Sequence, residues 1–257
     1  MAAGLAFMTT RGAPLHYLAI NAGMLVAAAV LVLAAPPIRS ERARFAAAGI
    51  ALAVLALPLL VGPELNGVQR WIAIGPIALN SALLAAPALA VLAAGMDPRA
   101  QFIVALAVLA AAVAQPDASL ALAVGGAAIG VALATRETRP ALVAIGALLA
   151  AIWAHKRGNL PPQPFVERIY VDAAMTSTPW LVLLVAASIA CVVLIAIDPA
   201  LHRTQRFALA GSMSAFFYAA AISDYPTPLI GYGAAAILGL ALALWLARGR
   251  ADHTSSG

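Results

Sequence analysis

Long runs of apolar residues alternate with short polar connections along the chain. Nine of these runs approach or exceed the length of about 20 residues that a helix needs to cross the hydrocarbon core of a bilayer. Ala and Gly dominate nearly all of them, and small residues let neighbouring helices approach closely. The pattern predicts an all-α, polytopic transmembrane helix bundle of about nine spans, in which strands are not expected. The predicted spans are residues 13–35, 45–62, 71–95, 101–115, 118–135, 140–155, 179–197, 207–222 and 228–247.

Only the sequence AQPDAS, residues 114–119, separates the fourth run from the fifth. A single helix through both runs would be too long for a bilayer, so two spans with a tight turn at Pro116 are the better interpretation. Asp117 fits the N-cap of the fifth span, where a carboxylate accepts free backbone amides. A carboxylate at the membrane edge is also a candidate functional group, so both roles stay open.

The composition indicates that lipid is the solvent of this chain. Of 257 residues, 64% are hydrophobic and 10% are charged, whereas soluble domains are closer to half apolar and a quarter charged. The formal net charge of +5 comes from arginines in short connections, as membrane orientation requires, so nucleic-acid binding is not expected. Cys191 is the only cysteine and the four histidines are scattered. We therefore expect neither a disulfide framework nor a metal or cofactor.

The basic residues set the orientation, because cytoplasmic connections carry an excess of Arg and Lys. Nine spans place five basic residues on one side, against ten on the other. The richer side is predicted to be cytoplasmic, which puts the N-terminus outside and the C-terminus inside. Residues 1–12 then form an N-terminal segment, 13–247 the bundle and 248–257 a polar tail. The ten are Arg39, Arg42, Arg44, Arg99, Arg136, Arg139, Arg203, Arg206, Arg248 and Arg250, and the five are Arg11, Arg70, Lys156, Arg157 and Arg168.

All chemically unusual connections fall on the predicted outer side. Arg70, beside Trp71, is either an interfacial anchor or an anion ligand, since a guanidinium pairs well with phosphate. The outer loop, residues 155–180, places apolar residues around Glu167 in the sequence FVERIYV, so this piece is expected to pack against the bundle or the membrane. Apolar surroundings disfavour the charged form of a carboxyl group, which suits a general base; a solvated run of charges is the alternative.

The last span is preceded by the sequence SDYPTPLIGYG, residues 223–233. This segment contains two prolines, and Gly231 and Gly233 lie on either side of Tyr232. An ordinary start of a membrane helix does not need so many residues that interrupt a helix. The pattern favours a broken or re-entrant entry that protein or water must cover. A structural role is expected for the two glycines.

Three of these outer segments resemble, in the same order, motifs of the SEDS family of cell-wall polymerases (RodA, FtsW and SpoVE). They are NGVQRWIAIG, AQPDASLAL and PTPLIGYGAAAIL, and LPPQPFVERIYVDAA is a looser match. The resemblance extends over roughly residues 13–247. Family members have ten helices with both termini inside. Nine spans with an outside N-terminus are what remains if the first helix is missing. Compared with the family, the large outer loop is also much shortened.

The resemblance implies a protein of the bacterial inner membrane that acts on an undecaprenyl-linked, lipid II-type substrate in peptidoglycan synthesis, cell shape or division. It also implies that Glu167 is the catalytic base. The substrate-binding residues that it implies are Arg70, Gln115, Asp117 and Tyr232. A single-pass transpeptidase or other membrane subunits would be partners, besides membrane lipids. The alternative is a catalytically inactive SEDS-like subunit, because ALNS (78–81) and GYGAA (231–235) lack a carboxylate and hydroxyls of the family. Whether the chain is an enzyme stays open at this point.

Overall fold

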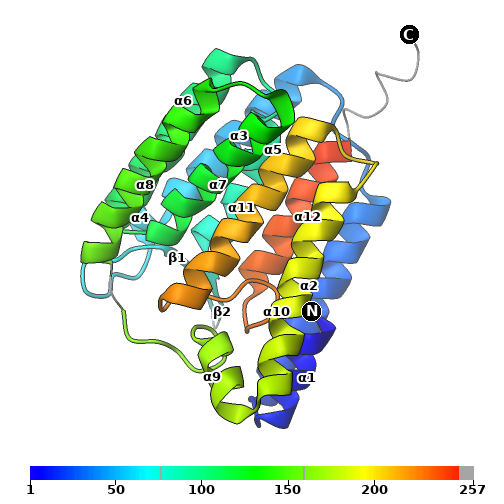
Figure 1. Ribbon diagram of the computed structural model, residues 1–257, viewed down its shortest axis with the longest axis vertical. Helices are drawn as coiled ribbons and strands as arrows, with labels where there is room; N and C mark the ends of the chain where they lie inside the picture. The colour runs from blue at the N-terminus through cyan, green and yellow to red at the C-terminus, as the bar shows by residue number, and fades with distance from the viewer. Residues whose placement is uncertain (76, 159, 249–257) are drawn as a thin grey trace.

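The computed structural model is a bundle of long, roughly parallel and antiparallel helices (Figure 1). It describes residues 1–75, 77–158 and 160–248. Most of the predicted polar tail, including Arg250, lies outside the described residues.

Each of the nine predicted spans contains a helix. Four segments, Leu15–Ala34, Glu41–Val61, Ala118–Thr135 and Thr178–Ile197, are long and apolar enough to cross a membrane by themselves. A full count of nine crossings stays a prediction, as does the position of each terminus. The helices in these spans are α2 (Leu15–Ala34), α3 (Glu41–Ala56) with α4 (Pro58–Val61), α5 (Ser81–Ala93), α6 (Pro98–Ala114), α7 (Ala118–Thr135), α8 (Arg139–Arg157), α10 (Thr178–Ile197), α11 (Arg203–Ile222) and α12 (Ala234–Arg248).

Large apolar side chains cover the outward faces of several helices. Leu15 and Leu33 on α2 are each 79% exposed, and Leu142 on α8 is 69% exposed. Soluble monomers seldom expose apolar surface on this scale, so these faces suit contact with lipid.

The third predicted span is only partly helical, and the expectation that strands are absent was wrong. Strands β1 (Trp71–Ile74) and β2 (Ile77–Asn80) form an antiparallel hairpin, with Trp71 opposite Asn80. Gly75 adopts φ +57° between them, a left-handed conformation that favours glycine. Helix α5 begins only at Ser81, where the Asn80 side chain accepts the Leu83 amide at 2.9 Å. A short apolar run fits a strand as well as a helix, which explains the error.

The N-terminal segment is also more ordered than its weak apolar pattern indicated. Residues Ala2–Thr10 form helix α1. The backbone of α1 lies against that of Ile230, and Gly4 is the residue that permits this approach. Phe7 packs edge-on against Trp180 with ring centroids 5.5 Å apart. Helix α1 therefore covers part of the irregular segment that precedes α12.

The predicted outer segments gather at one end of the bundle (Figure 1). Helices α1 and α9 (Ile169–Thr176), the latter inside the outer loop, lie at the lower end of the figure, and the hairpin lies above them, just below the middle. Residues 223–233 are not helical and precede α12 at this same end, as the proline and glycine pattern predicted. The end that gathers the segments predicted to be outside is called the outer end below, and its sidedness stays a prediction. The opposite end, where Arg99, Arg139 and Arg203 lie at the starts of α6, α8 and α11, is called the arginine-rich end.

Helices α7 and α11 pack closely through glycine. A Cβ atom added to Gly126 would collide with the Gly211 carbonyl, and one added to Gly130 would collide with the Phe207 carbonyl. The prediction that small residues permit a compact bundle is confirmed at this interface.

Replacing Gly126 with Val is therefore expected to separate α7 from α11. Overpacking of this kind costs roughly 1–3 kcal/mol of unfolding free energy, and more where the obstacle is backbone. Thermal unfolding in detergent would measure the loss. Gly146→Val is the matched control, because Gly146 is also helical but has open space beside it. Equal unfolding temperatures for the two variants would contradict the close packing.

Candidate functional site

Arg70 lies at the centre of the outer end, immediately before β1. Its side chain is only 2% exposed. Its guanidinium donates to the Gly158 carbonyl at 2.9 Å and lies 3.9 Å from the Asp117 carboxylate. The rings of Trp71 and Tyr225 lie 5.2 and 5.0 Å from the guanidinium carbon, within the range of cation–π attraction. Arg70 is thus a buried cation held from several sides, and not an interfacial anchor that reaches into water.

Asp117 is the N-cap that the sequence predicted, and it also faces Arg70; its functional role stays a prediction. As the N-cap of α7, its Oδ1 accepts the Leu120 amide at 3.1 Å and the Ser119 hydroxyl at 2.6 Å. The same oxygen faces Arg70. Asp117 is fully buried, and its Oδ2 has no hydrogen-bond partner within the described part of the chain. The predicted turn between α6 and α7 therefore places a carboxylate against the buried arginine.

Gln115 is buried beside this pair but contacts other elements. Its amide donates to the Leu55 carbonyl of α3, and its oxygen accepts the Ser81 hydroxyl at 3.4 Å. These contacts connect α6 to α3 and to the start of α5. Gln115 therefore satisfies buried polar groups between helices, and its predicted place on a cavity wall stays a prediction.

Glu167 is 7% exposed and lies in the loop before α9. The backbone amide of Gln163 donates to Oε2 of Glu167 at 2.7 Å. The backbone of Glu167 pairs with Pro226 in an isolated antiparallel bridge. Desolvation raises the pKa of Glu167 to about 7, against the opposing effects of the Gln163 hydrogen bond and of the Arg70 charge. The expectation that the charged form of this carboxyl group is disfavoured is confirmed, and burial is the cause.

Tyr232 joins the outer loop to helix α2. Its backbone amide donates to the Phe165 carbonyl at 2.6 Å. Its ring stacks on Tyr17 with centroids 3.8 Å apart and planes within 5°. The Tyr17 ring in turn packs edge-on against Phe165 at 6.4 Å. Tyr232 is thus connected to Glu167 through the backbone of the same loop.

Two residues that complete this end were not singled out in the sequence. The Tyr225 hydroxyl accepts the Ala118 amide at 3.1 Å at the start of α7. Asn21 of α2 is 1% exposed, and its side chain donates to the Gly231 carbonyl at 3.0 Å and accepts the Gly233 amide at 3.1 Å. Asn21 alone carries a detectable signal, because a polar amide inside an apolar span needs a partner.

The structure pairs Arg70 with Asp117 and places Tyr225 against Arg70. Glu167 is joined to this group through its backbone bridge to Pro226, next to Tyr225, and is close enough for the Arg70 charge to affect its pKa, while Tyr232 lies on the adjoining loop. The cluster combines a fixed positive charge with a carboxyl group that can exchange a proton near neutral pH. Such a pair can polarise or hold an anionic group and accept a proton from a neighbouring hydroxyl. The described residues include no group of three His, Cys, Asp or Glu side chains that could hold a metal ion.

Comparisons with known proteins identify the fold. No family model matches the chain, and no curated protein matches it. Among solved structures, a point mutant of the rod shape determining protein RodA from Thermus thermophilus aligns with a TM-score of 0.72 and 21% identity, covering 97% of this chain and 94% of that one. RodA without the mutation aligns with a TM-score of 0.64 and 20% identity, covering 97% and 93%. A chain of a peptidoglycan synthase complex, described as coordinating polymerization and crosslinking, aligns with a TM-score of 0.68 and 22% identity, covering 96% and 94%.

Proposed function

We propose that this chain, which has the fold of RodA, is a divergent SEDS-type glycosyltransferase of the bacterial inner membrane. Its substrate would be a sugar carried on polyprenyl pyrophosphate, of the lipid II type, at the outer end of the bundle. The observation that carries the proposal is the buried carboxyl group of Glu167, whose pKa is raised to about 7 beside the charge of Arg70. The proposed roles of these residues come from the motif resemblance to the SEDS family, and the fold shared with RodA supports them.

In this reaction Glu167 would be the general base. It accepts the proton of an acceptor sugar hydroxyl while that oxygen attacks the anomeric carbon of the donor. The bond from the anomeric carbon to the pyrophosphate oxygen breaks, and the polyprenyl pyrophosphate leaves with the electron pair. A base works best when its pKa lies near the operating pH, and burial gives Glu167 this property.

Arg70 would stabilise the negative charge that grows on the leaving pyrophosphate. Its Nε atom has no hydrogen-bond partner among the residues described. Because Arg70 is only 2% exposed, a direct contact with pyrophosphate requires the segments around Gly158 and Tyr225 to move apart. Asp117 would hold the guanidinium in place both before and after these segments move apart.

The burial of Arg70 favours a second candidate function, a catalytically inactive SEDS-like subunit of a membrane complex. A guanidinium covered by a carbonyl, a carboxylate and two rings has its strongest contacts within the protein. The missing hydroxyls of the segment 231–235 point in the same direction. In this case the Arg70–Asp117 pair would hold the outer end of a scaffold together.

In both cases we propose partners in the membrane, either a single-pass transpeptidase or other subunits that act in cell shape or division. The likeness to a chain of a peptidoglycan synthase complex supports this proposal. The exposed apolar faces of α2 and α10 offer surface for a transmembrane helix as well as for lipid.

One experiment tests the proposed reaction and separates the two candidates. The purified protein, alone and with any partner that co-purifies, is incubated with labelled lipid II, and the products are separated by gel electrophoresis. Glycan polymer formed by the protein or by its complex is the expected result. A stoichiometric partner together with no polymer in either preparation would overturn the enzyme and support the scaffold.

A further inference from the structure

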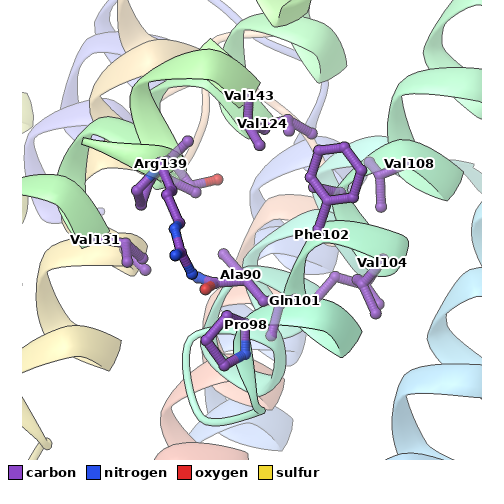
Figure 2. Close-up of a pocket in the computed structure, with 18 of the residues that line it drawn as sticks. Ala90, Pro98, Gln101, Phe102, Val104, Val108, Val124, Val131, Arg139 and Val143 are labelled. Atoms are coloured by element: carbon purple, nitrogen blue, oxygen red, sulfur yellow. The ribbon is translucent and has the colours of Figure 1, made fainter. Parts of the chain in front are cut away.

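A cavity of about 500 Å³ lies at the arginine-rich end of the bundle, away from the cluster around Arg70. It is lined by residues of α5, α6, α7, α8 and α11, and Figure 2 labels lining residues from the first four of these helices. Its volume falls in the range of roughly 300–1,000 Å³ that is typical of small-molecule sites. The hollow exists because many of the side chains that face it are alanine, including Ala86, Ala90, Ala93, Ala123, Ala127 and Ala208.

Between its polar mouth and Ser212 at its floor, the walls of the cavity are apolar. Near the surface it is lined by Phe102 and Leu142, which are 48% and 69% exposed. At depth it is lined by Val108, which is 3% exposed. On α6 the lining extends from Arg99 to Val108, which corresponds to about 14 Å at a rise of about 1.5 Å per residue. This depth is close to one leaflet, half of the roughly 30 Å hydrocarbon core.

The mouth of the cavity is polar and carries a net positive charge. It is lined by Arg99, Gln101, Glu137 and Arg139, two cations against one carboxylate. Figure 2 shows the Arg139 side chain extending from α8 across the mouth, past Val131 toward Gln101. Arg99 and Arg139 are exposed, and within the described ranges neither guanidinium has an ion pair. Both are free to bind an anionic group.

A buried hydroxyl group without a partner at the floor of the cavity also indicates that protein does not fill this space. Ser212 of α11 lines the cavity and is 1% exposed, yet its hydroxyl has no hydrogen-bond partner in the part of the chain that the structure describes. Buried hydroxyl groups are rarely left unpaired where packing is complete. The packing beside Ser212 is therefore incomplete.

From these observations we propose that the cavity binds one acyl chain of an anionic phospholipid, with its headgroup held by Arg99 and Arg139. A soluble anion would use the two guanidinium groups but not the apolar depth. A purely apolar molecule would gain nothing from the charged mouth. A phospholipid uses both, since its chain matches the depth of one leaflet and its phosphate matches the arginine fork. The site is independent of the proposed reaction at the outer end.

The test uses the full-length protein in a mild detergent and counts bound lipid by native mass spectrometry. Phosphatidylglycerol is the anionic probe, and phosphatidylethanolamine with the same acyl chains is the zwitterionic one. We expect one tightly bound phosphatidylglycerol per chain and at least a tenfold preference over phosphatidylethanolamine. Equal binding of the two lipids by the wild-type protein would overturn the proposal, and so would displacement of phosphatidylglycerol by inorganic phosphate.

Two variants locate the site. The double substitution Arg99→Gln and Arg139→Gln removes the headgroup contacts at exposed positions and is expected to remove the preference. Arg136→Gln, an exposed arginine of the same connection that does not line the cavity, is the matched control and keeps it. Ala90→Phe fills the hollow and is expected to reduce binding of both lipids. A double variant that stays as selective as the control would overturn the proposal even if Ala90→Phe does not fold.

Discussion

Polymer formation from lipid II is expected to fall by at least about 10²-fold when Glu167 is replaced with Gln, since general-base catalysis contributes roughly 10²–10⁴-fold. Gln is nearly the same size and can still accept the Gln163 amide through its carbonyl oxygen, but it cannot take a proton. The rate of glycan formation from labelled lipid II, with any required partner present, measures the effect. Glu64→Gln is the control, because Glu64 is an exposed carboxylate that accepts a hydrogen bond from Gln69 at the surface. Wild-type activity in Glu167→Gln would overturn the assignment of this residue as base.

The pH dependence of the wild-type rate follows from the same carboxyl group. A base must be ionised to act, and burial raises the pKa of Glu167 to about 7. We therefore expect the rate to rise with pH up to about 7 and to level off above it. Below pH 6 the rate should fall about tenfold per pH unit, as expected for one ionisation. A rate that is flat between pH 5 and 8 would contradict a role for this ionisation.

Thermal unfolding of Glu167→Gln shows whether a loss of activity in this variant comes from the missing base or from a damaged fold. The pKa of Glu167 in the folded protein lies above its ordinary value of 4.5, so the folded state disfavours the ionised carboxylate. The resulting cost is absent below about pH 4.5, grows between pH 4.5 and 7, and is complete above pH 7, where it reaches roughly 3 kcal/mol at about 1.4 kcal/mol per pKa unit. Glu167→Gln removes this cost. It is therefore expected to unfold at a higher temperature than the wild type at pH 8 and at a similar one at pH 5.

Local patterns in the sequence were sufficient to predict several parts of the candidate site. The apolar residues around Glu167 predicted its burial, and Ile169 and Tyr170 are indeed 0% and 7% exposed. Pro116 predicted the turn, and Asp117 at the start of the fifth span fitted an N-cap, which the structure shows. These features depend on residues only a few positions apart, which is the range in which periodicity and capping rules apply.

Other features depend on pairs that are distant in the sequence and could not be read from it. The hydrogen bond from Arg70 to Gly158 and the stacking of Tyr17 on Tyr232 become visible only once the helices are packed. The hairpin after Arg70 was missed for a different reason, because an apolar run of four residues does not distinguish a strand from a helix. The cavity at the arginine-rich end is likewise a product of packing, since an alanine in an apolar span gives no sign of what lies opposite.

Replacing Arg70 with Met is expected to destabilise the outer end more than any other single change to its charged groups. Removal of one partner from a buried ion pair costs about 3–5 kcal/mol, because the other charge is left without compensation. In Arg70→Met the Asp117 carboxylate, fully buried, loses this partner. Asp117→Asn should cost less, since Asn can still cap α7 and Arg70 keeps its contacts with Gly158 and two aromatic rings. Unfolding in detergent measures each effect.

A double variant and a matched pair make this result specific. Arg70→Met with Asp117→Asn removes both charges and is expected to be more stable than Arg70→Met alone. The control pair is Arg168 and Asp224, 3.8 Å apart but 48% and 34% exposed, where Arg168→Gln should change the unfolding free energy by less than about 1 kcal/mol. If Arg70→Met is no more destabilising than Arg168→Gln, the buried pair does not hold the outer end together. If instead Asp117→Asn folds normally and loses polymerisation, the reaction depends on the Asp117 carboxylate, and the scaffold candidate is excluded.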